Sequence, residues 1–261
     1  MTPVITLTTD WGPRDHYAGA VKGAIISRLP DARIIDISHR IKPFNIKQAS
    51  FILRNAFPLF PEGTIHIIGI NTEESENTPH VAVQFRNHYF IGADNGVFTL
   101  MFDESPAKIV ELDINQDTGY FTFSTRDRFV KAAVHLAQGK AIEELGHVRS
   151  DLNALISMRP HISGDTISSR VVYIDNYENA FLNITSKEFA EVGKNRRFSL
   201  SIKGKSHQIN TIREAYSAVP EGEIAILYST TGLIEISINK GNAASLLGLK
   251  TDDIVLITFT N

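Results

Sequence analysis

The spacing of hydrophobic residues changes near residue 160, and this change limits the folds open to the chain. Before it, β-branched segments such as 4–10 alternate with segments whose apolar residues recur at helical spacing, such as 15–29. After about residue 165, nearly every segment alternates apolar and polar residues with period two. The 261 residues are therefore expected to form two domains, over 1–158 and 165–261.

The first domain is expected to be an α/β domain with a mainly parallel sheet. Strand and helix patterns follow one another with short connections, which favours parallel strands covered by helices. Its last helix is expected over 126–140, with Gly139 near its end. The second domain is expected to be an all-β, barrel-like domain, and residues 158–164 are interpreted as the linker.

Composition excludes several classes of function. A formal net charge of −3 gives no electrostatic reason to expect nucleic acid or an anionic membrane as partner. The chain has no cysteine, which excludes disulfides, thiolate metal sites and cysteine nucleophiles. It shows neither a signal peptide nor an apolar stretch long enough to span a bilayer, so we expect a cytoplasmic protein.

Two carboxylates flank the Trp-Gly-Pro turn that follows the first expected strand. Ligands of α/β sheets bind at the carboxyl ends of strands, where this turn is expected to lie. Asp10 ends the strand, has no helix to cap, and could accept two hydrogen bonds side by side from a diol. Asp15 could bind a ligand, or it could cap the helix that follows.

Two further polar segments allow both a structural and a functional interpretation. Residues 92–96, Gly-Ala-Asp-Asn-Gly, could be a plain turn or a ligand loop. Within a strand, Asp175, Tyr177 and Asn179 would share one face and could meet an ammonium group and a base. Alternatively, they form a hairpin turn in which Asp and Asn bond the backbone, and taken alone this segment favours the turn.

The common catalytic motifs do not occur. The nine histidines show no metal-binding spacing. His39, near Asp36 in the segment DISHR, is the one histidine that this segment offers beside an acid, so no metal is expected. A Gly-x-Ser-x-Gly elbow, a Walker loop and a Gly-x-Gly-x-x-Gly loop are also missing.

Seven segments together resemble the S-adenosyl-L-methionine (SAM) hydroxide adenosyltransferase family, which includes the fluorinase and chlorinase enzymes. Each is modest alone, but their order along nearly the whole chain is specific to the family. They are TTDWGPRDHYAGAVKG, DISHRIKPFNIKQAS, FPEGTIHI, GADNG, RDRFVKAAVHLAQG, IDNYENAFLNIT and STTGLIEISINKGNAASLLGL.

The resemblance implies an α/β N-terminal domain, a C-terminal β-barrel, and a homotrimer with its active sites at subunit interfaces. The implied chemistry is an SN2 attack on C5′ of SAM by water, hydroxide or a halide, with L-methionine as the leaving group. SAM is then a substrate, and no cofactor is implied. A sulfonium is already activated, so the enzyme must mainly align the reacting atoms and strip water from the nucleophile.

The resemblance also assigns ligand contacts residue by residue. Asp10 would bind the ribose hydroxyls, Phe44 would lie against the ribose, and Asp15 and Tyr17 would lie near the methionine end. In the second domain, Asp175 would meet the methionine ammonium, and Tyr177 and Asn179 the adenine. The loop and strand expected to close over the ligand contribute Thr230, Thr231 and Asn239.

The chain departs from the family where the hydrolytic members hold water. Those members carry an Asp, an Arg and a His, and the corresponding residues here are Asn71, Thr78 and Ser124. The halogenating members also lack that triad, and Thr125 could supply a hydroxyl like the serine of the fluorinase. Three glutamates in the altered loop would disfavour a halide if they point inward, and would form a solvated loop if they point outward. They are Glu73, Glu74 and Glu76.

Three hypotheses remain open. The first is a SAM hydrolase that forms adenosine and L-methionine with a remodelled water site. The second is adenosyl transfer to a halide or another nucleophile. The third is a non-catalytic protein that binds SAM or adenosine. Among the enzymatic hypotheses hydrolysis comes first, because water needs no dedicated pocket.

Overall fold

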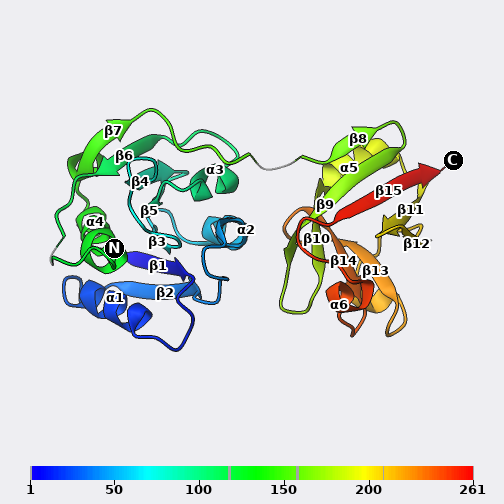
Figure 1. The fold of residues 1–261 in the computed structure, drawn as a ribbon, viewed down its shortest axis with the longest axis horizontal. Helices are drawn as coiled ribbons and strands as arrows, with labels where there is room; N and C mark the ends of the chain where they lie inside the picture. Colours follow the sequence, from blue (N-terminus) through cyan, green and yellow to red (C-terminus); the bar gives the residue numbers. More distant parts are fainter. Residues whose placement is uncertain (1, 117–118, 157–158, 208, 261) are drawn as a thin grey trace. The chain divides into compact units, whose positions relative to one another are not determined.

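The computed structural model of the protein describes residues 2–116, 119–156, 159–207 and 209–260 (Figure 1). The chain divides into two units, Met1–Ile156 and Ser157–Asn261. Each unit has its own sheet, with one hydrophobic core on each face of the sheet in the first unit and one core in the second unit.

The first unit contains a seven-stranded sheet in the order β2-β1-β3-β5-β4-β6-β7. The pairs β1–β2, β1–β3 and β3–β5 are parallel, whereas β4–β5, β4–β6 and β6–β7 are antiparallel. The expectation of a mainly parallel sheet is therefore wrong, because the hairpin β4–β5 reverses the chain and two antiparallel strands follow it. The strands are β1 Val4–Thr9, β2 Arg33–Ser38, β3 Ile65–Gly69, β4 His80–Phe85, β5 His88–Ala93, β6 Lys108–Leu112 and β7 Gly146–Arg149.

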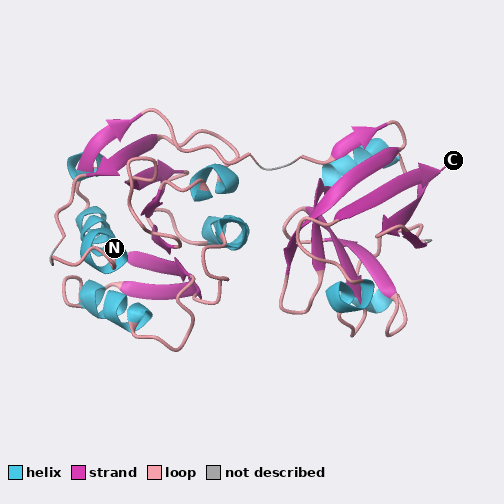
Figure 2. Ribbon diagram, viewed as in Figure 1, coloured by secondary structure: helices cyan, strands magenta, loops and turns pink. Residues whose placement is uncertain are grey.

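Helices cover both faces of this sheet, as the apolar strand sequences require (Figure 2). In β3, Ile65 and Ile67 belong to one core, and Ile68 belongs to the other. The first core also receives side chains from α1 and α4, and the second from α2 and α3. The helices are α1 Tyr17–Ile26, α2 Ile46–Ala56, α3 Val97–Met101 and α4 Val130–Ala137.

The helix ends explain where the expected boundaries hold and where they shift. Asn45 caps α2, because its side chain accepts a hydrogen bond from the backbone N–H of Gln48 at 2.9 Å. The N-cap of α1 is His16, so Asp15 precedes the cap, and the alternative in which Asp15 caps this helix is wrong. The expected helix 126–140 begins as a π-helical turn, Thr125–Phe129, and continues as α4.

The second unit is a curled antiparallel sheet in the order β12-β11-β15-β9-β10-β14-β13, with β8 paired to β9. Its ladder does not close among the described residues, and two helices accompany it, so the expected all-β barrel is only partly confirmed. Strand β8, His161–Ser163, falls within the expected linker. The other elements are β9 Thr166–Ile174, β10 Ala180–Thr185, α5 Ser186–Gly193, β11 Arg197–Ile202, β12 Lys205–His207, β13 Ile224–Tyr228, β14 Leu233–Ile238, α6 Ala243–Leu247 and β15 Ile254–Thr260.

A buried histidine pair lies within the first sheet. Nδ1 of His66 and Oγ1 of Thr6 form a hydrogen bond of 2.7 Å. Nε2 of His66 lies 3.2 Å from Nδ1 of His88. Burial, together with the neighbouring His88, lowers the pKa of His66 to about 3. The folded protein therefore keeps His66 neutral at pH values where the unfolded chain would protonate it.

We predict that His66 makes the first unit sensitive to acid. Between about pH 6.5 and pH 3 the unfolded state binds a proton that the folded state does not, which costs up to roughly 1.4 kcal/mol per pH unit. His66→Gln should reduce this loss, because Gln does not titrate. The test is urea unfolding at pH 7, 5.5 and 4, followed by the fluorescence of Trp11, the one tryptophan. The exposed His147→Gln is the control, and equal slopes in both variants would contradict the prediction.

Candidate functional site

Three chain segments leave the first sheet at the same edge. Strand β1 pairs in parallel with β2 and β3, with Thr8 opposite Ser38 and Thr9 opposite Gly69. The residues that follow these strand ends therefore gather at one edge, which is where ligands of such sheets bind. They are Asp10, His39 and Asn71.

Asp10 lies half-buried at this edge and holds the loop that contains Phe44. Its Oδ2 accepts a hydrogen bond from the backbone N–H of Phe44 at 2.8 Å. Phe44 adopts a left-handed backbone, with φ of 63°, and its side chain is 70% exposed. Burial raises the pKa of Asp10, and the Phe44 N–H partly offsets this. The sequence-predicted pair Asp10 and Phe44 is thus brought together, and each oxygen of Asp10 can accept further hydrogen bonds.

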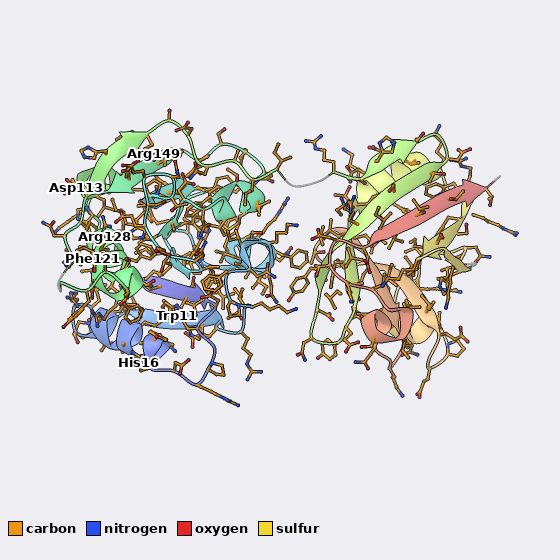
Figure 3. All side chains as sticks on the ribbon, in the orientation of Figure 1. Trp11, His16, Asp113, Phe121, Arg128 and Arg149 are labelled. Carbon is orange, nitrogen blue, oxygen red and sulfur yellow. The ribbon has the colours of Figure 1, made fainter. Side chains whose placement is uncertain are left out.

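Four rings form an aromatic cluster beside Asp10: Trp11, Tyr17, His39 and Phe123 (Trp11 is labelled in Figure 3). Trp11 stacks on His39 with ring centroids 6.4 Å apart and meets Phe123 edge-on at 5.5 Å. Tyr17 meets Phe123 edge-on at 5.2 Å. The ring of Trp11 also lies against the backbone of Gly69, where an added Cβ would approach Cζ2 to 2.8 Å.

His39 ties the Trp-Gly-Pro turn to the end of β1. Its backbone oxygen accepts a hydrogen bond from Gly12 N at 2.7 Å, and its Nδ1 lies 2.6 Å from Thr9 Oγ1. Nε2 lies 3.1 Å from Asp36 Oδ1, close enough for an ionic contact but without the direction of a hydrogen bond. Asp36 also accepts a hydrogen bond from Lys22 at 2.5 Å. The contacts of His39 and Asp36 therefore hold the segment after β2 to the Trp-Gly-Pro turn and to α1.

The loop after β3 is closed by its own side chains. Asn71 has a left-handed backbone, with φ of 45°, and is exposed. The hydroxyl of Thr78 lies 2.7 Å from that of Ser75 and bonds within the loop, so Thr78 serves the turn. At the end of the loop, Nε2 of His80 lies 2.9 Å from the carbonyl oxygen of Thr72.

The π-helical turn places Ser124 and Thr125 next to the aromatic cluster, because Phe123 precedes them. Both are buried, at 4% and 0% exposure. Thr125 Oγ1 has no hydrogen-bond partner among the described residues. Of the three loop glutamates, Glu74 contacts the buried Arg128 of this turn. All three glutamates are exposed, but the contact with Arg128 turns Glu74 toward the protein, so the interpretation as a solvated loop fits only Glu73 and Glu76.

Residues 92–96 form a structural turn. Asn95 donates to the carbonyl oxygens of Ile70 at 3.0 Å and Asn71 at 3.2 Å, which fixes the loop after β3. Both carboxylate oxygens of the buried Asp94 lie 3.0 Å from the backbone N of Asn153. The polar groups of this turn are therefore used to hold two neighbouring segments.

In the second unit, Asp175 organises a hairpin turn between β9 and β10. Its Oδ1 accepts hydrogen bonds from the backbone N–H groups of Tyr177 at 2.9 Å and Asn179 at 2.8 Å. Asn179 is 6% exposed and also donates to Asp175 Oδ2 at 3.2 Å. The arrangement on one strand face is therefore wrong, and the alternative turn is confirmed. The ring of Tyr177 stays 76% exposed.

Strand β14 separates the remaining predicted contacts. Thr230 and Thr231 lie in the turn before the strand, where Thr231 Oγ1 lies 2.5 Å from Ser229 Oγ. Asn239 follows the other end of the strand and donates to Val219 O at 2.8 Å. Six residues of strand span about 20 Å, so these residues do not form one contact group within this unit.

A buried acid lies near the Asp175 turn and was not predicted. Glu235 is 3% exposed and accepts a hydrogen bond from the Tyr216 hydroxyl at 2.9 Å. Burial raises the pKa of Glu235, and so does the charge of Asp175, while Tyr216 partly offsets the rise. Burial and the bond to Glu235 raise the pKa of Tyr216 to about 12. Glu235 and Asp175 are therefore close enough to influence each other's ionisation.

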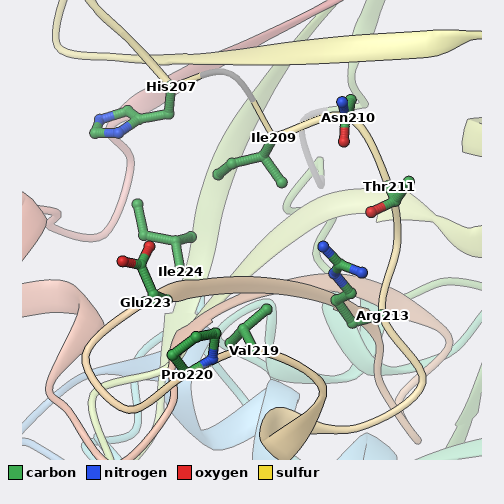
Figure 4. Close-up of a pocket in the computed structure, with 9 residues that line it drawn as sticks. All are labelled: His207, Ile209, Asn210, Thr211, Arg213, Val219, Pro220, Glu223 and Ile224. Carbon is green, nitrogen blue, oxygen red and sulfur yellow. The ribbon is translucent and has the colours of Figure 1, made fainter.

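A hollow of about 500 Å³ in the second unit contains none of the sequence-predicted site residues (Figure 4). It is lined by the connection between β12 and β13, including His207, Arg213 and Glu223. Its lining side chains do not converge on a buried polar group, so we assign it no role.

Family models match both units. The model of the SAM hydroxide adenosyltransferase N-terminal domain matches residues 5–146, and that of the C-terminal domain matches residues 169–256. The chain belongs to the SAM hydroxide adenosyltransferase family. The resemblance inferred from the seven segments is thereby confirmed.

Curated members of this family align along almost the whole chain. The (R)-S-adenosyl-L-methionine hydrolase of Methanocaldococcus jannaschii is 30% identical, covering 97% of this chain and 95% of that protein. The hydrolase of Thermus thermophilus is 29% identical, covering 96% and 97%. A fluorinase of an Actinoplanes species is 22% identical, covering 98% and 97%.

Solved structures show the same fold. An uncharacterized conserved protein from Thermotoga maritima superposes with a TM-score of 0.90 at 28% identity, covering 98% of this chain and 99% of that one. A conserved hypothetical protein from Thermus thermophilus gives a TM-score of 0.75 at 26% identity, with both chains covered fully. Among the described residues, no helix is long and apolar enough to cross a membrane.

Sequence reasoning missed most of the aromatic cluster of this family member. Trp11 is the one tryptophan of the chain and adjoins Asp10, which was a usable signal. Phe123 lies two residues before Thr125, but only the fold brings it to Trp11. Glu235 was detectable as an acid inside an otherwise apolar strand segment.

We predict that Gly69→Ala displaces Trp11. The new Cβ would lie 2.8 Å from the indole, so the ring must move, and overpacking of this kind costs about 1–3 kcal/mol. The fluorescence maximum of Trp11 should shift, and the urea midpoint should fall. Gly23→Ala is the matched control, because a Cβ at that helical glycine meets nothing within 4 Å. An unchanged emission spectrum in Gly69→Ala would refute the close contact.

Proposed function

We propose that this chain hydrolyses S-adenosyl-L-methionine, with water attacking C5′ to give adenosine and L-methionine. The observation that carries the proposal is Asp10, a half-buried carboxylate at the carboxyl end of β1, beside an aromatic cluster, in a chain of this family. Its carboxylate suits the two ribose hydroxyls. Family members named (R)-S-adenosyl-L-methionine hydrolase support water as the nucleophile.

The surroundings of Asp10 suit a positively charged substrate. Aromatic ring faces attract cations, and the cluster of Trp11, Tyr17 and Phe123 presents such faces near Asp10. In the second unit, the carboxylate of Asp175 lies in the same turn as the exposed ring of Tyr177. We propose that Tyr177 stacks on adenine and that Asp175 meets the methionine ammonium. Asp15 and Tyr17 are proposed to lie near the methionine end.

We further propose a homotrimer, in which the first unit of one subunit and the second unit of the next share a ligand. The separation of Thr230 and Thr231 from Asn239 along β14 then means that at most one end of this strand faces a given ligand. The Asp175 turn leads into Ala180, the first residue of β10, which pairs with Ile236 near the end of β14. This end of β14 is the one that Asn239 follows, so we propose that the ligand meets Asn239 and not Thr230 and Thr231. The proposed trimer predicts a mass in solution three times that of one chain, which light scattering measures.

Transfer of the adenosyl group to a halide is the second candidate. The buried hydroxyl of Thr125, which lacks a described partner, favours it, and so does the relatedness to fluorinases. Glu74 disfavours it, because its carboxylate in the neighbouring loop repels anions.

We predict adenosine and L-methionine as the products when the purified protein is incubated with SAM in chloride-free buffer. Product should increase in proportion to enzyme and time, as measured by chromatography of the nucleosides. A 5′-halogenated nucleoside that appears with added halide would favour the second candidate instead. A rise in melting temperature with SAM but without product would identify a binding protein and refute hydrolysis.

We predict that Asp10→Ala weakens SAM binding by about 10²-fold or more, because hydrogen bonds to a charged group contribute about 1.5–3 kcal/mol each. Asp10→Asn should have a smaller effect, since its oxygen can still accept from Phe44. Isothermal titration calorimetry measures both affinities. Asp31→Ala, at an exposed turn before β2, is the control. Wild-type affinity in Asp10→Ala would exclude the ribose assignment.

A further inference from the structure

Arg128 is a buried cation whose two Nη atoms both have hydrogen-bond partners. Its side chain is 10% exposed. Nη1 donates to Glu74 Oε2 and to His80 Nδ1, the latter at 3.1 Å, and Nη2 donates to the Leu112 carbonyl at 3.0 Å. A buried guanidinium is costly without such pairing, so the sequence must keep a carboxylate near it.

His80 is held neutral, and its tautomer follows from its contacts. The carbonyl oxygen of Thr72, 2.9 Å from Nε2, can only accept, so Nε2 carries the proton. Nδ1 then accepts from Arg128. Burial lowers the pKa of His80, and Arg128 lowers it further, against the raising effects of Thr72 and Glu74. His80 is therefore neutral, with both ring nitrogens hydrogen-bonded, and it contacts the Arg128–Glu74 ion pair.

Glu74 is the exposed member of this group. Oε2 accepts from Arg128, whereas Oε1 lies 3.6 Å from His80 Nδ1, which has no proton to give. The side chain is 41% exposed, so Oε1 can accept a proton from a molecule outside the group. The neighbouring Glu73 and Glu76 are also exposed, and among the described residues neither forms an ion pair with a buried cation.

The π-helical turn connects this group to the aromatic cluster. Thr125 Oγ1 and Arg128 Nε are both buried and lack a hydrogen-bond partner among the described residues. They lie three residues apart within the same π-helical turn. Phe123, two residues before Thr125, contacts Trp11 and Tyr17. Buried polar atoms of this kind are usually satisfied by water, and π-helical turns are frequent at functional sites.

We propose that Glu74 is the proton acceptor for the nucleophilic water of the hydrolysis, with the Thr125 hydroxyl as a second contact of that water. This inference rests on the proposed function. The water oxygen forms a bond to C5′ while the C5′–S bond breaks. The electron pair of the broken C5′–S bond stays on sulfur, which gives the neutral thioether. The proton released by the water passes to Glu74 and then to solvent. Arg128 and His80 are positioning residues, because they act through Glu74.

The test compares Glu74→Gln with the wild type in the SAM turnover assay. Removal of a general base typically lowers the rate by about 10²–10⁴-fold. We expect kcat to fall in this range, with KM and the SAM affinity from calorimetry unchanged. In Glu74→Ala, added formate should restore part of kcat, and Glu74→Asp should keep part of it. Glu76→Gln, a neighbouring loop acid, is the matched control and should retain wild-type kcat.

Three outcomes would overturn the inference. If the wild type turns over and Glu74→Gln matches it, Glu74 accepts no proton and the proposed function stands. If Glu74→Gln loses kcat, SAM affinity and melting temperature together, and formate restores nothing, Glu74 only holds the loop. If the wild type forms no adenosine while binding SAM, the proposed function fails, and the role of Glu74 fails with it.

Discussion

Parallel pairing of β1 with both of its neighbours is the constraint on which the candidate site depends. It fixes Thr9 opposite Gly69 and Thr8 opposite Ser38, so three loops leave the sheet together. The absence of a side chain at Gly69 leaves room for the indole of Trp11. A shift of one residue in this register would move Thr9 away from His39 and turn its side chain to the other face.

Polar contacts to backbone groups hold the loops at this edge, in addition to the packing of the aromatic cluster. Asp10 holds the Phe44 backbone, His39 holds Gly12, and Asn95 holds the loop after β3. Such bonds contribute about 0.5–1.5 kcal/mol each in net terms, but a buried group left unpaired costs about 1–3 kcal/mol. The loops are therefore fixed mainly by the cost of alternative arrangements, which keeps a site ordered before a ligand binds.

Local patterns predicted the elements well and their assembly less well. The strand over 4–10 and the helices over 15–29 and 126–140 were predicted from periodicity and correspond to β1, α1 and α4, whereas β6, β7 and α3 were not predicted. The mixed sheet did not follow, because the turn Arg86-Asn87 shows a hairpin but not which strands pair beyond it. Of the site, Asp10 was predictable from its place at a strand end. The group around Arg128 was not, because Arg128 follows His80 by 48 residues and Glu74 by 54, and only the fold brings the π-helical turn to the segment of Glu74 and His80.

The three altered water-site positions have different consequences in this fold. Thr78 is occupied within its loop, Asn71 is exposed at a left-handed position, and Ser124 is buried beside the π-helical turn. None of them offers a charged side chain, yet the same loop and turn carry an acid and a guanidinium a few residues further on. The sulfonium leaves as a neutral thioether, so no general acid is needed. The proposed reaction requires that the water, C5′ and sulfur lie in line, that other water is excluded, and that one group accepts the proton. Because Arg128 must be paired to remain buried, a carboxylate at Glu74 is favoured by stability as well as by this chemistry, and selection for either would preserve both.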